Sequence, residues 1–503
     1  MRFEKGPGYE IPNLKSGIQN PSDWPTYRHD AARRGSTAAS VPSQLRKAWQ
    51  TAGGGRLSAP VIADGRVFVA ECDAHTIRVL DAASGQPVWS YTAGGRIDSP
   101  PTVWQGRVLF GSADGWVYCL RAEDGVLAWR FRAAPEDLRI VSEGQIESAW
   151  PVPGSVLVQD GVALATAGRS SYLDGGIRLC RLDAQTGRLL SETVLDHRDP
   201  KTGVQPKDAI QGTNMPGALP DVLSSDGHSV FLRHNRFDLE GQVQPPDMPH
   251  LFSAAGFLDD SWWHRTYWLW GMNMGTNYGG WPNVGNQVPA GRLLVFDDTT
   301  VYGFGRDRYF HTGAHVGIDA TTVFHYNLGA EGPRTTQYQA FAISRNEPIA
   351  KPKAANKAKP NAERPENPRA KPNAEPSAKP VAKSPAKPAG KPKAKAGVQA
   401  ALPAKQYRWT RPLPILARAM VLAGDRLVVA GPPDLFQADD PLAAIEGRCG
   451  GRLLVLSAAD GKLLAEYPLD SPPAFDGLAA ASGKLYLATT DGRIVCFGTP
   501  GNR

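Results

Sequence analysis

Seven segments of the chain share one short pattern, and this repetition constrains the fold more than any other feature. Each segment has an apolar run, a tight turn and a second apolar run. Turn pairs such as Asp-Gly and Ser-Gly suit the positive φ angles of tight β-hairpins. The segments are VIADGRVFVA (61–70), TVWQGRVLFG (102–111), VLVQDGVALAT (156–166), VLSSDGHSVFL (222–232), LLVFDDTTVYGF (293–304), MVLAGDRLVVAG (420–431) and LAAASGKLYLAT (478–489).

The first two hairpins belong to units that repeat in phase. Gly85 and Gly125 lie 40 residues apart, as do Trp89 and Trp129. The turns at 183–187 and 457–461 have the same pattern and occupy the same position in their units. Each unit therefore has a hairpin, a third strand, a turn and a fourth strand. Four strands with a period near 40 residues are typical of a β-propeller blade.

The two ends of the chain predict that the ring of blades closes. The last unit stops after a third strand at 491–498, and RKAWQTA (46–52) resembles a fourth strand without preceding partners. We expect 46–52 to complete the last blade, which removes exposed sheet edges. The predicted fold is all-β, a single propeller of four-stranded blades closed by an N-terminal strand. We expect seven blades, with eight as the alternative.

One segment differs sharply from the rest in composition. Residues 351–405 hold 12 Lys, 2 Arg, 3 Glu and 11 Pro without any aromatic residue, a net charge of +11. The whole chain carries +7, so the remaining 448 residues carry −4. We expect the segment to be disordered and to be inserted inside the fifth blade. The folded part then gives no electrostatic reason to expect nucleic acid, apart from weak contacts by 351–405.

The predicted organisation follows from these observations. It comprises an N-terminal arm (1–45), blades 1 to 5 (46–345), a Lys/Pro/Ala-rich insertion (346–405), blades 5 to 7 (406–498) and a tail (499–503). No apolar run is long enough for a transmembrane helix. The N-terminus MRFEKGPGYEIPN shows no secretory signal. The five cysteines are scattered and do not form a disulfide framework; those at 119, 180 and 496 lie on third strands, where we expect buried thiols.

The sequence resembles a known family. The LDAxxGxxxW pattern at Asp81–Trp89, the lead-in WPTYRHDAARRG (24–35) and the loop GRSSYLDGG (168–176) are similar to bacterial propellers related to pyrroloquinoline quinone (PQQ) dehydrogenases. The resemblance covers roughly 24–345 and 406–498. It implies export to the periplasm or beyond. It also makes PQQ with calcium a possible cofactor, but the vicinal cysteine pair typical of the large PQQ dehydrogenases is missing, which disfavours the quinone.

In a propeller, the loops between strands two and three lie on the same face as the loops that join successive blades. In this sequence these are the long loops. Function concentrates on such loops. The catalytic candidates are Glu147, Arg169, Asp174, His264 and Arg265, and the cofactor-binding candidates are Trp150, Tyr172 and Trp281. A carboxylate there could act as a base or bind calcium, and flat aromatics could stack on a sugar or a planar cofactor. Each candidate has a purely structural alternative. It could be part of a turn whose Asp and Ser side chains bond to their own backbone, a hydrogen-bonded loop carboxylate, or an aromatic ring packed against the next blade.

Metal binding is a weaker hypothesis. The candidates are His75, in the loop ECDAH, and the pair His311 and His315, whose HxxxH spacing is interrupted by a glycine. That spacing would align two histidines on a helix, but the glycine between them argues against a helix there.

Two functions of different classes remain open. The first is a non-catalytic module that binds a protein or glycan partner with the long-loop face. The alternative is an enzyme with an axial site on that face, either a quinone-dependent alcohol or sugar dehydrogenase or a glycan-active enzyme. The choice has to come from the site, because a fold does not imply a function.

Overall fold

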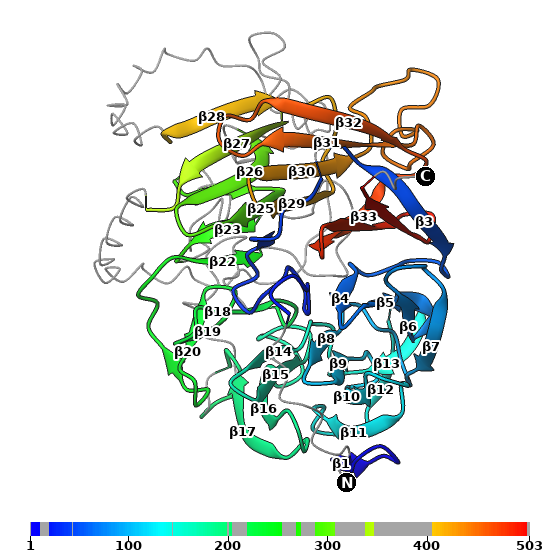
Figure 1. Ribbon diagram of the computed structural model, residues 1–503. Coiled ribbons are helices and arrows are strands. Elements are labelled where there is room, and N and C mark those ends of the chain that lie inside the picture. The colour runs from blue at the N-terminus through cyan, green and yellow to red at the C-terminus, as the bar shows by residue number, and fades with distance from the viewer. Residues whose placement is uncertain are drawn as a thin grey trace, which may run out of the picture. The chain divides into compact units, whose positions relative to one another are not determined.

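The computed structural model describes residues 2–10, 20–42, 44–142, 144–198, 201–203, 219–253, 268–272, 287–306, 338–346 and 405–499. Residues 1–348 and 405–503 belong to one compact unit. Eight of the nine sheets that the described strands form are built from antiparallel blade strands, and they follow one another as the blades of a propeller (Figure 1). No described helix is long and apolar enough to cross a membrane.

Blades are numbered in chain order, and each runs from its inner to its outer strand. Blades 1 to 4 are β4–β7 (Val61–Ala63, Arg66–Glu71, Thr76–Asp81, Pro87–Thr92), β8–β11 (Thr102–Trp104, Arg107–Gly111, Trp116–Arg121, Leu127–Arg132), β14–β17 (Leu157–Gln159, Val162–Ala167, Ile177–Asp183, Leu189–Leu195) and β18–β21 (Leu223–Ser225, Val230–Leu232, Asn235–Phe237, Val243–Gln244). Blades 5 to 8 are β22–β24 (His250–Ser253, Trp268–Gly271, Ala290–Gly291), β25–β28 (Leu293–Phe296, Thr300–Arg306, Tyr338–Ser344, Tyr407–Pro412), β29–β32 (Ala419–Ala423, Arg426–Gly431, Gly451–Ser457, Leu463–Leu469) and β33–β35 (Pro473–Ala481, Lys484–Thr489, Arg493–Gly498) with β3 (Arg46–Ala52).

The closure of the ring takes the predicted form. Strand β3, from near the N-terminus, pairs antiparallel with β35 from the C-terminal end, with Ala52 opposite Arg493 and Arg46 opposite Gly498. The first and last parts of the chain therefore share blade 8. This arrangement ties the ring together by backbone hydrogen bonds that span almost the whole sequence.

The expectation of seven blades was wrong, because the structure has eight. The additional blade is blade 5, where β22 and β23 are separated by residues 254–267 instead of a tight turn. A search for hairpins around short turns could not find it. The Lys/Pro-rich insertion consequently follows β27 in blade 6, between the third and fourth strands as expected, rather than in the fifth blade. The insertion itself lies outside the described residues.

Tryptophan side chains join successive blades at their outer edges. The Trp89 indole, on β7 of blade 1, donates a hydrogen bond of 3.0 Å to the carbonyl of Ala122 in the β10–β11 turn of blade 2. Its ring lies against Gly125 of that turn, where an added Cβ would be 2.6 Å from the ring. Equivalent indole-to-turn contacts link blade 8 to 1, 2 to 3 and 6 to 7, through Trp49, Trp129 and Trp409.

An N-terminal arm, residues 20–37, crosses the inner strands at the end of the channel where these strands enter their tight turns (Figure 1). Its backbone bonds to Ile62 of blade 1, Val103 of blade 2, Ser225 of blade 4, Phe296 of blade 6 and Leu422 of blade 7. The short strand β2 (Ser36–Thr37) pairs parallel with β29. The arm therefore packs into this end of the channel.

Two buried arginines hold the arm in place. Arg28 forms a 2.8 Å ion pair with Asp476 of blade 8, and both side chains are only 3% exposed. Arg33, also buried, donates to the carbonyls of Leu223 and Tyr27, each at 2.9 Å. Buried charges need such partners, because an unpaired one carries a large desolvation cost.

The apolar core lies between neighbouring blades, where inward-facing side chains of adjacent sheets meet. Cys119, Cys180 and Cys496 lie on third strands, are buried, and are free thiols, as expected. Burial raises the pKa of the Cys180 thiol to about 12. These cysteines therefore behave as small apolar packing residues.

Substituting Gly125 by Ala should show how strongly the indole contacts stabilise the ring. We expect a loss in the free energy of unfolding about 1–3 kcal/mol larger than for Gly65→Ala, because overpacking costs that much. Gly65 has a similar φ, +72° against +76°, but open space around its Cβ position. Equal losses in denaturant titrations would show that the Trp89 contact does not constrain the turn.

Removing Arg28 should weaken the attachment of the arm to blade 8, where the Tyr27 hydroxyl also donates to Asp476. Arg28→Ala leaves the Asp476 carboxylate buried without its cation, and we expect a loss of about 3–5 kcal/mol in unfolding free energy. The control is Arg34→Ala, because Arg34 is half-exposed and its partner Asp298 is 81% exposed, where a loss of about 1 kcal/mol or less is expected. Similar losses for both variants in chemical denaturation would contradict this anchoring role.

Candidate functional site

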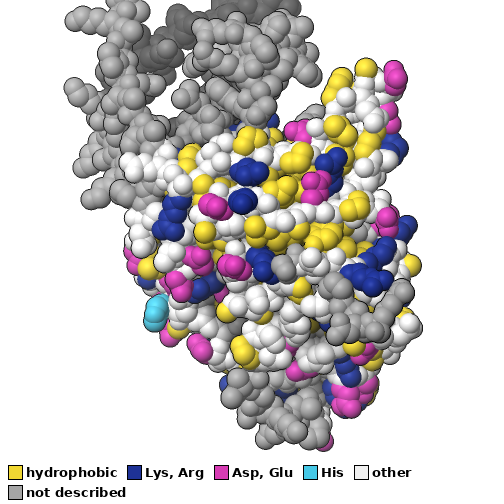
Figure 2. Space-filling model, turned by 45° about the horizontal axis from the view of Figure 1, so that its top comes forward, with side chains coloured by type: hydrophobic (Ala, Val, Ile, Leu, Met, Phe, Trp, Pro, Cys, Tyr) yellow, Lys and Arg dark blue, Asp and Glu magenta, His cyan; other side chains and the backbone are white. Residues whose placement is uncertain are grey.

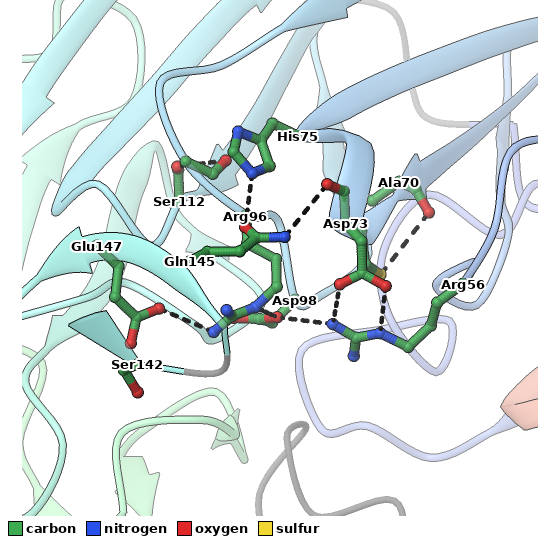
Figure 3. A network of polar contacts seen from close by, with 12 residues as sticks. Arg56, Ala70, Asp73, His75, Arg96, Asp98, Ser112, Ser142, Gln145 and Glu147 are labelled. Carbon is green, nitrogen blue, oxygen red and sulfur yellow. Dashed lines mark hydrogen bonds and ion pairs between the residues drawn. The ribbon is translucent and has the colours of Figure 1, made fainter.

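A chain of ion pairs crosses the long-loop face over blades 1 to 3 (Figure 3). Arg56, before β4, bonds to Asp73, in the loop between β5 and β6, at 3.0 Å and to Asp98 at 3.3 Å. Arg96 and Asp98, in the connection from blade 1 to blade 2, pair with each other at 2.6 Å. All these groups come from the connections that the sequence places on one face.

The chain of ion pairs continues into blade 3 through one buried carboxylate. One oxygen of Glu147 accepts from Arg96 at 2.9 Å, and the other accepts from Arg169 of the 168–176 loop. The side chains of Arg96, Asp98 and Glu147 are at most 2% exposed. Burial raises the pKa of Asp98, and the guanidinium groups of Arg96 and Arg56 oppose that shift.

Glu147 belongs to a β-hairpin that stands outside the blades. The hairpin consists of β12 (Arg139–Ser142) and β13 (Gln145–Ser148), which form a two-stranded sheet of their own. Besides Glu147, the Gln145 side chain binds His75 of blade 1 at 2.7 Å. Polar contacts thus fix the inner side of the hairpin to blades 1, 2 and 3.

The other side of this hairpin is apolar and exposed. Val141 and Ile146 lie opposite each other across the two strands, and they are 78% and 68% exposed. Leu138, just before β12, is 50% exposed. We call these three residues the hairpin patch. Val141 and Ile146 are among the most exposed large apolar side chains of the described residues. Exposed apolar side chains that cluster can mark interaction sites.

A second apolar protrusion occurs on a connection of the same kind, the long loop between β30 and β31 in blade 7. Phe436 is 79% exposed and Leu435 is 54% exposed. Further along the loop, Arg448 bonds to Asp440 at 2.6 Å and also to Glu446. Ion pairs therefore brace this loop as well.

The structure brings several predicted site residues together. Glu147 and Arg169 form the ion pair described above, and the indole of Trp150 donates to the backbone carbonyl of Asp174 at 2.7 Å. Tyr172 stacks on His197 with ring centroids 4.7 Å apart. These contacts leave the catalytic and cofactor-binding roles untested.

Other predicted residues lie elsewhere or cannot be placed. His264, Arg265, Trp281, His311 and His315 all lie outside the described residues. The neighbouring Trp268 and Trp270 are on β23 and are buried between blades 5 and 6, where the ring centroids of Trp270 and Phe296 lie 4.7 Å apart. His75 is described and bonds to Gln145 rather than to other metal-ligand side chains.

The sequence analysis missed Arg56, Arg96 and Asp98. Their signal was present in the 40-residue repeat, because GGRLSAP (54–60) and GGRIDSP (94–100) occupy the same place in successive units. Arg56 and Arg96 are therefore equivalent positions of neighbouring blades. A comparison of inter-blade connections, in addition to turns, would have identified the pair.

The residues of this chain of ion pairs do not fit a quinone with calcium. Calcium needs several carboxylate or carbonyl oxygens around one point, whereas Asp73, Asp98 and Glu147 each bond to arginine. No three His, Cys, Asp or Glu side chains among the described residues could hold a metal ion. Within this chain of ion pairs, the guanidiniums of Arg56, Arg96 and Arg169 are matched by three carboxylates.

Comparisons with known proteins agree with the fold. The family model described as outer membrane protein assembly factor BamB matches residues 30–213. The chain is 25% identical over 189 residues to the dehydrogenase subunit of alcohol dehydrogenase (quinone) from Gluconobacter oxydans (strain 621H), covering 34% of this chain and 24% of that protein. It is 35% identical over 94 residues to outer membrane protein assembly factor BamB from Burkholderia pseudomallei (strain K96243), covering 18% of this chain and 24% of that protein.

A solved structure is similar over almost the whole chain. Quinohemoprotein alcohol dehydrogenase ADHIIG from Pseudomonas putida HK5 superposes with a TM-score of 0.54 at 12% identity, covering 96% of this chain and 81% of that one. At this identity the likeness concerns the fold alone. The chain spans about a quarter of the length of the curated relatives it matches. The repeated turns and the blades show a β-propeller, and the sequence matches support a PQQ-like one.

Proposed function

We propose that this propeller is a non-catalytic docking module that binds a protein partner through the hairpin patch on its long-loop face. The observation that carries the proposal is the exposure of Val141 and Ile146 on a hairpin whose opposite side is fixed by buried ion pairs. A rigid, exposed aliphatic pair loses little conformational entropy on binding, and its burial is favourable.

The polar groups of the same face support docking more than catalysis. A catalytic acid or base needs a proton-transfer position open to substrate, but both oxygens of Glu147 are engaged by guanidiniums and the side chain is buried. One curated relative is named an assembly factor and another a quinone dehydrogenase. Because the carboxylates of the ion-pair chain are all bonded to arginine, we favour a role like that of an assembly factor over that of a dehydrogenase.

A photo-crosslinking amino acid at position 146 of the full chain, expressed in its native cells, tests the proposal. We expect one discrete protein adduct, which mass spectrometry would identify. Adding Val141→Asp should reduce its yield at least tenfold, because a carboxylate would be buried at the contact. The matched control is the crosslinker at Val243, which is 54% exposed on β21 of blade 4, where no such adduct is expected.

Two results would overturn the proposal. One is an absent adduct, or an adduct that Val141→Asp leaves unchanged. The other is dye reduction with alcohols or sugars by the purified protein when it is supplied with PQQ and calcium, which would support the enzyme instead.

Loss of the Glu147 carboxylate should loosen the hairpin without touching the patch. In Glu147→Ala, the buried Arg96 loses one partner and Arg169 loses its carboxylate, and we expect a loss of about 3–5 kcal/mol in unfolding free energy. Amide hydrogen exchange between β12 and β13 should also become faster. Glu466→Ala is the control, because Glu466 and Arg452 form a half-exposed pair, where about 1 kcal/mol or less is expected. Unchanged exchange in the hairpin would mean that Glu147 does not hold it.

A further inference from the structure

A different part of the surface, the outer edge of blade 2, is already occupied by an extended segment. Strand β1 (Phe3–Lys5) pairs antiparallel with β11, the outer strand of blade 2, with Phe3 opposite Phe131 and Lys5 opposite Trp129. Among the described outer strands, β11 alone carries an added strand on its outer side. The outer strand β32 of blade 7 shows the uncovered case: Leu463 and Leu464 are 37% and 50% exposed, and apolar side chains form a band across this rim (Figure 2).

Residues 2 and 4 of this segment form ion pairs with two different blades. Arg2 donates to Glu192 on β17 of blade 3 at 2.6 Å, and its guanidinium lies 4.9 Å from the centroid of the Phe131 ring. Glu4 pairs with Arg130 of β11 at 2.6 Å. The cation thus reaches blade 3 and the anion reaches blade 2, so the segment bridges the outer edges of the two blades. We call the surface that residues 2–9 cover between β11 and β17 the groove.

Aromatic contacts fill the same groove. Phe3 and Tyr9 meet edge to face with centroids 6.1 Å apart, and both pack against the core cluster around Trp129. The Tyr9 hydroxyl donates to the carbonyl of Thr186 in the blade 3 turn at 3.3 Å. The groove therefore recognises two rings as well as two charges.

Glycines set how closely the segment approaches. The Gly6 amide donates to Ala128 and the Gly8 amide to Leu127, each at 2.8 Å. A Cβ added at Gly6 would lie 2.1 Å from the Leu127 carbonyl oxygen. This obstacle is backbone, so it cannot move aside, and no larger residue fits at that position.

We propose that the groove between the outer edges of blades 2 and 3 is a peptide-binding site that residues 2–9 occupy in cis. Its ligand in a partner protein is an extended segment with a cation, an aromatic ring and an anion in succession, followed by glycine and a second aromatic. Recognition is by strand addition, in which the backbone ladder gives affinity and the side-chain pockets give specificity. The site is separate from the hairpin patch and does not depend on the docking function proposed above.

The test uses one substitution in two places. The probe is a fluorescent peptide with the sequence of residues 1–10, and fluorescence anisotropy measures its binding to the full chain. Gly6→Val in the chain should prevent the cis segment from seating and open the groove. We expect the peptide to bind this variant at least tenfold more tightly than the wild-type chain, in which the tethered segment competes at high effective concentration.

The same substitution in the peptide is the matched control. A Gly6→Val peptide should lose at least tenfold in affinity for the opened chain, and an Arg2→Ala peptide should also bind more weakly. Phe3→Ala in the chain provides a second opened form that introduces no clash, should Gly6→Val impair folding. The proposal is overturned if neither opened chain binds the peptide, or if the Gly6→Val peptide binds as well as the unmodified one.

Discussion

The contact between an indole and a glycine turn sets the spacing of the blades, and much of the remaining structure depends on it. Each of four tryptophans on a fourth strand bonds to a carbonyl in the next blade's turn, and its ring occupies the space beside a glycine. A side chain on that glycine would push the blades apart. Where the tryptophan is missing, a smaller contact takes its place: Ser191 at the equivalent register of blade 3 donates to the carbonyl of Glu240 at 3.2 Å.

The regularity of this contact explains why so much of the fold could be predicted. The indole and the glycine turn leave a fixed spacing in the sequence, and the closing strand 46–52 could be recognised by its lack of partners. Blade 5 was missed because its strands are separated by long connections, and period-2 strands of four residues are indistinguishable from other short apolar runs. The pairing of these strands depends on contacts between residues far apart in the sequence, and a local sequence pattern does not reveal such contacts.

The candidate site was predictable only in part, for a different physical reason. Glu147 and Arg169 could be selected because both lie on long connections of one face. Their partner Arg96 lies in the connection from blade 1 to blade 2, and its role depends on three blades meeting at that point. The exposure of Val141 and Ile146 was also invisible, since an aliphatic residue in a loop gives no sign of which side of a hairpin it will occupy.

The two surfaces proposed for binding use opposite solutions to one problem. A strand edge or an apolar pair left in water tends to associate. At the outer edge of blade 2 the chain covers β11 with its own residues 2–9, so any partner has to displace a segment with matching charges. At the hairpin β12–β13 the buried carboxylate of Glu147 holds the strands while Val141 and Ile146 remain uncovered in the described structure. The first surface is therefore suited to a ligand that competes, and the second to a partner that finds its contact ready formed.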